Sequence, residues 1–428
     1  MKFLVLSICI VLGAFIILLQ KYLYKTIRTP LTFFAILWCV VLSVANMQLY
    51  NYYSPSLLVN SIIIIGIVIF AICFCVFSGK KNLKRVIDNN FFECHLNLQI
   101  IYFVNIIATI FTIPFLGNAI NIIRNNGLAF LRANAGDTNI GIASAGWQNV
   151  ILDSVVRPVF MTMAILAVTV SFSEIRKKTK IVLLSIAVVE NFLLTLLTAA
   201  RAPMVNFVFY FIIAFIIFKG KNIIAAIKTE KKKIVVCIIL IAIILYITSE
   251  RNFSEDTSIL ENFYVYYFSG PSYMSRLLEN VHEYGLNGRL LYGTATFGFI
   301  TNWLSFIYTF LTGKSQGSLW VLGSVITNQQ YWVGENTLLN AMCTVFYIFI
   351  VDWGILGIII GPLIIAFISA KIFKNLYKRQ TTFTYAIYIY WTYILIRTVF
   401  KWDLLNVDFA VFIVLMYLFT VKKIRIRI

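Results

Sequence analysis

One arginine has the setting of an anion-binding residue. Arg201 lies in the segment Thr198-Ala-Ala-Arg-Ala-Pro203, which joins the apolar runs Ile181–Ala200 and Met204–Phe218. As helices the two runs would measure roughly 57 Å together, barely two crossings of a ~30 Å hydrocarbon core, so the turn cannot project far from a membrane. Pro203 suits the first position of the second helix, whose N-terminal amides would point toward the turn. A guanidinium in this place predicts an anion site; the alternative is an arginine that extends to lipid headgroups.

Residues that could move a proton or hold a second charge occur later in the chain. His282 lies among arginines, including Arg276 and Arg289, and neighbouring cations would lower its pKa and keep it a neutral base. Glu335 and Asp352 are rival bases. Asp352 interrupts an apolar run, so it should face protein or water rather than lipid.

The elements that must position these residues are apolar runs of membrane-spanning length. Hydrophobic residues make up 61% of the 428 residues, charged residues make up 12%, and the mean hydropathy is +0.88. A water-soluble chain could not bury so much apolar surface, so the composition predicts an all-α polytopic membrane protein. Eleven crossings are expected, over Phe3–Leu19, Leu31–Met47, Leu57–Phe77, Leu96–Leu116, Val150–Phe172, Ile181–Ala200, Met204–Phe218, Ile234–Ile247, Trp353–Ala370, Ala386–Phe400 and Leu404–Thr420.

Basic clusters predict the orientation of these helices. Lys and Arg total 36, and most of them fall into six clusters that separate the apolar runs at every second junction. The clusters are Lys21, Lys25 and Arg28; Lys80, Lys81, Lys84 and Arg85; Arg176, Lys177, Lys178 and Lys180; Lys219, Lys221, Lys228 and Lys231 to Lys233; Lys371, Lys374, Lys378 and Arg379; and Lys422, Lys423, Arg425 and Arg427. Because positive residues are retained in the cytoplasm, the N-terminus is expected outside and the C-terminus inside.

The same rule leaves one large extracytoplasmic loop. We expect residues 1–248 to form an N-terminal bundle of about eight helices, 249–338 to form this loop, and 339–428 to form the C-terminal helices. In the loop region, Ala295–Leu311, broken by Asn302, is expected to be re-entrant or interfacial, and Thr337–Val351 to lie along the outer interface. A thirteen-helix arrangement, in which both segments cross, is the alternative.

The composition also argues against several functional classes. The formal net charge of +19 is explained by the cytoplasmic clusters, which lack the interleaved aromatics of a nucleic-acid surface. The seven cysteines lie in or beside apolar runs with no CxxC spacing, so neither a disulfide framework nor a metal site is expected. No cofactor is expected either.

The basic residues outside the clusters are mostly arginines. They are Lys2, Arg124, Arg132, Arg157, Arg201, Arg251, Arg276, Arg289, Lys314, Arg397 and Lys401. Retention in the cytoplasm does not distinguish Arg from Lys, whereas paired hydrogen bonds to phosphate favour Arg. Arg157 is expected to pair instead with Asp153, and Arg397 to join a network with acidic residues of the following segment.

Three segments resemble the bacterial oligosaccharide repeat-unit polymerases of the Wzy type. Thr198-Ala-Ala-Arg201 is similar to that family's small-residue-then-arginine element at an outer helix turn. Tyr267-Phe-Ser-Gly-Pro271 opens the long outer loop, as a Tyr/Gly/Pro segment does in the family. Glu335-Asn-Thr337, followed by Asp352-Trp-Gly-Ile-Leu-Gly357, resembles the family's Asn/Thr and Asp-Phe-Gly-x-x-Gly elements, although Trp353 replaces the usual aromatic residue.

The resemblance implies an inverting glycosyltransferase of the cytoplasmic (inner) membrane in bacteria. It would transfer a growing O-antigen, lipopolysaccharide or capsule glycan from a polyprenyl (undecaprenyl) pyrophosphate to a second lipid-linked repeat unit at the outer leaflet. A protein that regulates chain length is a candidate partner, and no nucleic acid is expected. The implied roles are pyrophosphate binding by Arg201, Arg276 and Arg289, proton transfer by His282 or Glu335, and substrate binding by Arg132, Tyr267, Asn336 and Asp352. A glycan ligase and a lipid-linked oligosaccharide flippase are the alternative functions.

Overall fold

The part of the chain that the structure describes is mostly helical. The computed structural model describes residues 2–79, 92, 94–134, 141–142, 146–220, 235, 241, 259–279, 290–312, 330–335, 337–339 and 342–421. Within these residues, eight helices are long and apolar enough to cross a membrane. The protein is therefore a helical chain of multi-pass membrane character.

Two compact units make up the structure. The first unit comprises Met1–Lys84, Asp256–Tyr377 and Ile394–Val407, and the second comprises Arg85–Glu255, Lys378–Tyr393 and Asp408–Ile428. Each unit therefore contains segments that are distant in the sequence. The expected division at residues 248 and 338 follows the chain and stays a prediction.

The first unit contains most of the short elements. Its elements are α1 (Lys2–Tyr24), α2 (Pro30–Met47), the 3-10 turn Leu49–Asn51, α3 (Leu57–Ser78), α12 (Ile259–Phe268), α13 (Gly270–Glu279), α14 (Gly298–Thr312), β1 (Tyr331–Trp332), β2 (Leu338–Leu339), α16 (Val345–Trp353), the 3-10 turn Gly354–Leu356, α17 (Gly357–Lys378) and the 3-10 turn Asp403–Leu405. Strands β1 and β2 pair antiparallel, with Tyr331 opposite Leu339 and Trp332 opposite Leu338.

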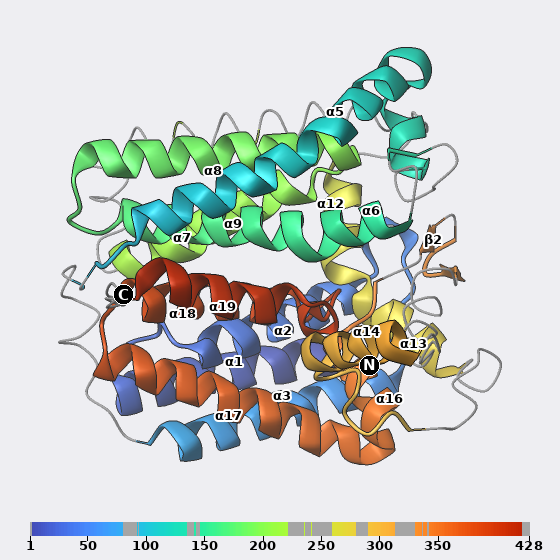
Figure 1. Ribbon diagram of the computed structural model, residues 1–428. Coiled ribbons are helices and arrows are strands. Elements are labelled where there is room, and N and C mark those ends of the chain that lie inside the picture. The colour runs from blue at the N-terminus through green and yellow to red at the C-terminus, as the bar shows by residue number, and fades with distance from the viewer. Residues whose placement is uncertain are drawn as a thin grey trace. The chain divides into compact units, whose positions relative to one another are not determined.

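The second unit is built around long helices. They are α5 (Leu98–Asn134), α6 (Gly146–Ile151), the π-helical turn Leu152–Val156, α7 (Arg157–Ser171), α8 (Lys177–Thr198), α9 (Ala202–Lys219) and α19 (Asp408–Thr420), with the first part of α18 (Thr382–Arg397). Helices α5, α7 and α9 all pack against α8 (Figure 1). Helix α5 bends at Gly127, which has a φ of 85° that glycine adopts at little cost.

Local chemistry explains several of the helix ends. Thr29 caps α2, since its hydroxyl accepts from the amide of Thr32 at 3.3 Å, and Pro30 occupies the first turn. The hydroxyl of Ser56 caps α3 in the same way through the amide of Val59. Helix α8 ends at Thr198, and the left-handed conformation of its C-cap residue Ala199 (φ 45°, ψ 31°) turns the chain toward α9.

The helices match most of the expected apolar runs. The first seven runs overlap α1, α2, α3, α5, the segment α6 to α7, α8 and α9, and the last three overlap α17, α18 and α19, with ends that differ by a few residues. The eighth run, Ile234–Ile247, lies outside the described residues except for Val235 and Ile241.

Two segments that were expected to be re-entrant or interfacial, Ala295–Leu311 and Thr337–Val351, differ from the prediction in detail. Helix α14 continues through Asn302, because the Asn302 side-chain amide donates to the carbonyl of Leu405 rather than interrupting the helix. With 15 residues α14 is about 22 Å long, which is short for a ~30 Å hydrocarbon core and suits the re-entrant or interfacial prediction.

Helix α16 departs further from its expected place. The segment Thr337–Val351 is not one helix, since Leu338 and Leu339 form β2 and α16 begins only at Val345. Seven of the nine α16 residues are buried, whereas an interfacial helix would expose one face to lipid. Helix α16 is thus part of the core of the first unit.

Candidate functional site

The turn between α8 and α9 holds Arg201 in a defined place. Arg201 is the N-cap residue of α9 (φ −69°, ψ −17°), and its carbonyl accepts from the amide of Val205 at 3.0 Å. Pro203 lies in the first turn of α9, as expected. The Arg201 side chain is half-buried. This geometry places a guanidinium beside the N-terminal amides of an apolar helix, where an anion is stabilised.

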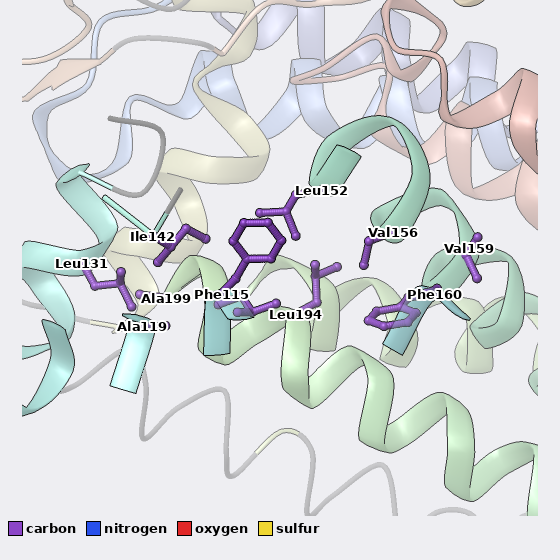
Figure 2. Packing of buried hydrophobic residues seen from close by; sticks show 12 residues of the cluster. Phe115, Ala119, Leu131, Ile142, Leu152, Val156, Val159, Phe160, Leu194 and Ala199 are labelled. Atoms are coloured by element: carbon purple, nitrogen blue, oxygen red, sulfur yellow. The ribbon is translucent and has the colours of Figure 1, made fainter. Parts of the chain in front are cut away.

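A buried hydrophobic cluster carries this turn. Ala199 belongs to it together with Ala119, Leu131 and Ile142 (Figure 2), and the cluster continues along α8 through Leu194. Its remaining buried members are Ala108, Phe115, Leu152, Val156, Val159, Phe160 and Leu197. The turn is therefore anchored on α5 as well as on its own two helices.

Arg201 and Arg132 both lie close in the chain to residues of this cluster. Arg132 directly follows the cluster residue Leu131, and Arg201 lies two residues after Ala199. The Arg132 side chain is exposed. Two of the expected ligand-binding arginines thus lie at one end of the second unit, next to the same packed residues.

In the first unit, several of the candidate residues lie at a turn that is rich in tyrosine. Residues 48–53, here called the tyrosine turn, join α2 to α3 and contain left-handed φ values at Gln48, Tyr50 and Asn51 (57°, 57° and 61°). Left-handed conformations of residues other than glycine cost roughly 1–2 kcal/mol each and persist where surrounding contacts hold them. Tyr50 and Tyr53 are exposed, whereas Tyr52 is buried.

Arg276 packs on the tyrosine turn. Its guanidinium carbon lies 5.3 Å from the centre of the Tyr53 ring, and its Nη1 donates to Glu279 at 2.9 Å. Two serines of α13 fix this arrangement: the Ser272 hydroxyl donates to the Tyr53 carbonyl at 2.6 Å, and the Ser275 hydroxyl accepts from the Ser56 amide at 2.9 Å.

Glu335 reaches the same turn from the β1–β2 connection. The Glu335 amide donates to the carbonyl of Asn51 at 3.4 Å, and the Tyr53 amide donates to the carbonyl of Val333 at 2.8 Å. The Thr337 hydroxyl donates to the Tyr52 hydroxyl at 3.0 Å. Because the Glu335 side chain is exposed, its carboxylate is accessible from solvent beside the tyrosines. The structure thus brings Arg276 and Glu335 onto one turn.

The buried tyrosines at this turn stay neutral over the physiological pH range. Burial raises the pKa of Tyr52, and the nearby Glu261 carboxylate raises it further, while the hydrogen bond with Thr337 acts in the opposite direction. Burial raises the pKa of Tyr264 to about 12. Tyr264 packs against the rings of Tyr50 and Tyr52, at 5.7 and 5.0 Å between centres. These side chains offer hydroxyl groups and ring faces rather than phenolate charge.

Tyr267 lies beside a second basic group. Its half-exposed ring is 5.6 Å from the ring of Phe400, over which the Arg397 guanidinium lies at 5.4 Å. Arg397 forms an ion pair with Asp403 at 3.1 Å, as expected from the sequence. The predicted pair of Arg157 with Asp153 is also confirmed, at 3.1 Å.

Asp352 is enclosed by protein. Its side chain is 0% exposed; Oδ1 accepts from the Ala295 amide at 3.0 Å, and Oδ2 accepts from the Thr296 amide at 2.6 Å and the Thr296 hydroxyl at 2.5 Å. The Asp352 carbonyl also accepts from the amide of Tyr292 at 2.9 Å. As expected, Asp352 faces protein. Its carboxylate and its carbonyl together hold residues 292–296 in place.

Three candidate residues, His282, Arg289 and Asn336, lie outside the described residues. Arg201 belongs to the second unit and Arg276 to the first, so their convergence on one pyrophosphate stays a prediction. Among the described residues, no group of three His, Cys, Asp or Glu side chains could hold a metal ion.

The tyrosine turn was not among the sites predicted from the sequence. A signal was present, since Tyr50-Asn-Tyr-Tyr53 joins two apolar runs on the predicted outer side. The contacts between this turn and residues 272–276 and 333–337 could not be inferred, because more than 200 positions separate them in the chain.

No family model, no curated protein and no solved structure matches this chain.

Proposed function

We propose that the protein is an inverting membrane glycosyltransferase that polymerises polyprenyl-pyrophosphate-linked oligosaccharide units at the outer leaflet of the bacterial cytoplasmic membrane. The observation that carries this proposal is Arg201, half-buried at the N-terminus of α9 on a turn anchored between apolar helices. A lipid-linked pyrophosphate is an anion that would reach this turn from the membrane itself. The resemblance of Thr198-Ala-Ala-Arg201 to the polymerase element supports the same assignment.

The reaction needs charge stabilisation and proton removal. The acceptor hydroxyl oxygen attacks the anomeric carbon of the donor sugar, and the bond between that carbon and the phosphate oxygen breaks. The pyrophosphate leaves with the electron pair, and inversion follows from attack on the opposite face. Arg201, with Arg276 or Arg289, would stabilise the charge that develops on the leaving pyrophosphate. His282 or Glu335 would accept the proton of the attacking hydroxyl.

The tyrosine turn supports glycan binding. Tyr50 and Tyr53 have exposed rings, Arg276 packs on Tyr53, and the backbone of the exposed Glu335 is hydrogen-bonded to this turn. Such a surface is able to stack on sugar rings and to bond their hydroxyls. Arg132, Tyr267 and Asn336 would contact other parts of the substrate.

The first test replaces Arg201 in a strain that lacks the native gene. Arg201→Ala should abolish long chains, since loss of one fixed charge that stabilises a transition state lowers the rate by about 10²–10³-fold. Arg201→Lys should restore the polymer only in part, because an ammonium group lacks the two-pronged geometry of a guanidinium. The measurement is the chain-length distribution of the glycan at equal amounts of membrane-inserted protein.

Arg157→Ala is the matched control, because Arg157 is exposed and already paired with Asp153. It should leave chain length near normal. Near-normal polymer from Arg201→Ala would contradict the role assigned to this arginine.

The products of a deletion strain separate the three functions. Loss of a polymerase leaves single repeat units on the final acceptor. Loss of a ligase leaves long chains on the carrier lipid. Loss of a flippase leaves lipid-linked units on the cytoplasmic face, and either of the last two results would overturn the proposal.

A further inference from the structure

One acidic side chain lies in the middle of an apolar helix, where the proposed chemistry does not use it. Glu190 is on α8 and is only 2% exposed. Within the described part of the chain, neither of its carboxyl oxygens has a hydrogen-bond partner. Thr198, at the end of α8, is eight residues away, which corresponds to about 12 Å along the helix. Glu190 is therefore well inside the second unit.

The face of α8 that carries Glu190 is packed. Its buried residues are Leu183, Ala187, Glu190, Asn191, Leu194, Thr195 and Leu197, which recur with the period of a helix. Leu194 and Leu197 belong to the hydrophobic cluster shown in Figure 2. The carboxyl group thus points into packed protein rather than toward the surface.

The described helices that pack on α8 offer Glu190 no unpaired cation within the hydrophobic cluster. In the sequence of α5, the charged residues are Arg124 and Arg132, both beyond Ala119, which packs in the cluster with Ala199 past the end of α8. In α7 the charged residue is Arg157, next to the cluster residue Val156; its side chain is exposed and forms an ion pair with Asp153 of the preceding π-helical turn at 3.1 Å. In α9 the charged residue is Lys219, in the last turn.

The tyrosine and asparagine side chains of these helices and of α8 are neutral. The titratable side chains inside the three helices are Tyr102 of α5 and Tyr210 of α9. Asn105 of α5 donates to the Ile101 carbonyl at 2.7 Å, and Asn191 of α8 donates to the Ala187 carbonyl at 2.7 Å. Neither type of group can balance a carboxylate charge as a cation would.

A lone carboxylate in such surroundings is strongly disfavoured. Removing an ionised carboxyl from water without a partner costs tens of kcal/mol in a continuum estimate, and such groups become neutral instead. A buried polar group without a partner calls for a ligand or a function, above all at membrane depth. A proton is the ligand that meets this requirement with no other coordinating atom.

We infer that Glu190 is a proton-binding site, which holds a neutral carboxylic acid while α8 is packed against α5, α7 and α9. The proton would leave only when α8 separates from these helices or when water reaches the carboxyl. Proton release would then report on, and be driven by, movement of the helix that ends at the Arg201 turn. The site itself does not depend on the proposed glycosyl transfer.

Reaction with dicyclohexylcarbodiimide tests this inference on the full-length protein in liposomes. The reagent enters apolar regions and attacks protonated carboxyls: the carboxyl oxygen adds to the carbodiimide carbon, the acid proton moves to nitrogen, and acyl migration gives a stable N-acylurea with no leaving group. Peptide mass spectrometry should find the adduct on Glu190 and should find it still at pH 8, far above the usual glutamate pKa of about 4.3.

Glu190→Gln should lose this adduct. Glu174→Gln is the matched control, because Glu174 is an exposed glutamate in the turn before α8, and the adduct on Glu190 should persist in that variant. The pH profile of the wild-type protein needs no variant and stands even if Glu190→Gln fails to fold.

Three results would overturn the inference. Glu190 could remain unmodified at every pH, or its labelling could disappear between pH 4 and 6 as for an ordinary exposed glutamate. Labelling could also be abolished by sodium or potassium at constant pH, which would identify Glu190 as a metal-cation ligand instead.

Discussion

At the scale of single residues, the acidic side chains differ in what surrounds them. Asp352 is fully buried but satisfied, since backbone amides and a hydroxyl donate to both of its oxygens. Glu190 is equally buried and has no such donors among the described residues. Glu335 is exposed at the tyrosine turn. Burial alone therefore does not identify a functional acid. Whether its carboxyl oxygens have hydrogen-bond donors is the more informative property.

Asp352→Asn tests the positioning role of Asp352. The substitution replaces one acceptor oxygen by an amide that donates, which would face the amide of Ala295 or Thr296. Leaving a buried donor without an acceptor costs about 1–3 kcal/mol, so the melting temperature in detergent should fall. Asp153→Asn is the control, because Asp153 is exposed and its surface ion pair contributes at most about 1 kcal/mol.

A different outcome would assign Asp352 to the substrate. If Asp352→Asn melts like the wild type and yet makes no polymer, then the carboxylate contacts the glycan after a rearrangement, and its hydrogen bonds to residues 295 and 296 are incidental.

At the scale of elements, the break between α16 and α17 gives the glycines of Asp352-Trp-Gly-Ile-Leu-Gly357 a structural reason. From the sequence, this segment could be interpreted only through its resemblance to a family motif. Gly354 has a φ of 60°, which ends α16. A Cβ on Gly357 would lie 2.0 Å from the carbonyl oxygen of Phe349, and a Cβ on Gly361 would lie 2.1 Å from the Phe349 ring. The spacing Gly-x-x-Gly thus serves a close approach of two helices.

Gly357→Ala should destabilise the protein. The new methyl group meets rigid backbone, and overpacking of this kind costs about 1–3 kcal/mol. Gly117→Ala in α5 is the matched control, since nothing lies within 4 Å of its added Cβ and alanine favours a helix over glycine by roughly 0.5–1 kcal/mol. Thermal unfolding of both variants in the same detergent is the measurement. Equal melting temperatures would show that α16 and α17 do not pack in this way.

At the scale of the whole molecule, contacts within the first unit agree with the topology that the basic clusters predict. Segments assigned to the same side of the membrane contact one another. Tyr24, at the end of α1, hydrogen-bonds Ser78 at the end of α3, and its ring lies 5.7 Å from that of Phe373 on α17. Tyr24 and Phe373 lie within basic clusters assigned to the cytoplasm, and Ser78 directly precedes another. The tyrosine turn, assigned to the outside, meets α13 and Glu335, which have the same assignment.

Cysteine labelling tests the orientation of the second unit. Arg132→Cys and Lys178→Cys, introduced one at a time into a protein without the seven native cysteines, place a thiol at exposed positions near opposite ends of the unit. A membrane-impermeant maleimide should label residue 132 in intact cells, and residue 178 only after permeabilisation. The reverse pattern would invert the topology and place Arg201 on the cytoplasmic side.

The apolar helices and the ion pair of Arg157 with Asp153 could be predicted from the sequence alone. The side of the membrane assigned to each connection also comes from the sequence and stays a prediction. These properties depend on residues close together in the chain, such as the length of an apolar run, the charge that follows it, or a spacing of four on one helix face. The tertiary structure was needed to show that Arg276 and Glu335 share the tyrosine turn, that Asp352 holds residues 292–296 and that α16 is buried. It was also needed to show that Glu190 has no donor among the described residues. Each of these features depends on packing between segments that are far apart in the chain. A local sequence pattern shows that a segment will be buried but does not show which distant segment will cover it.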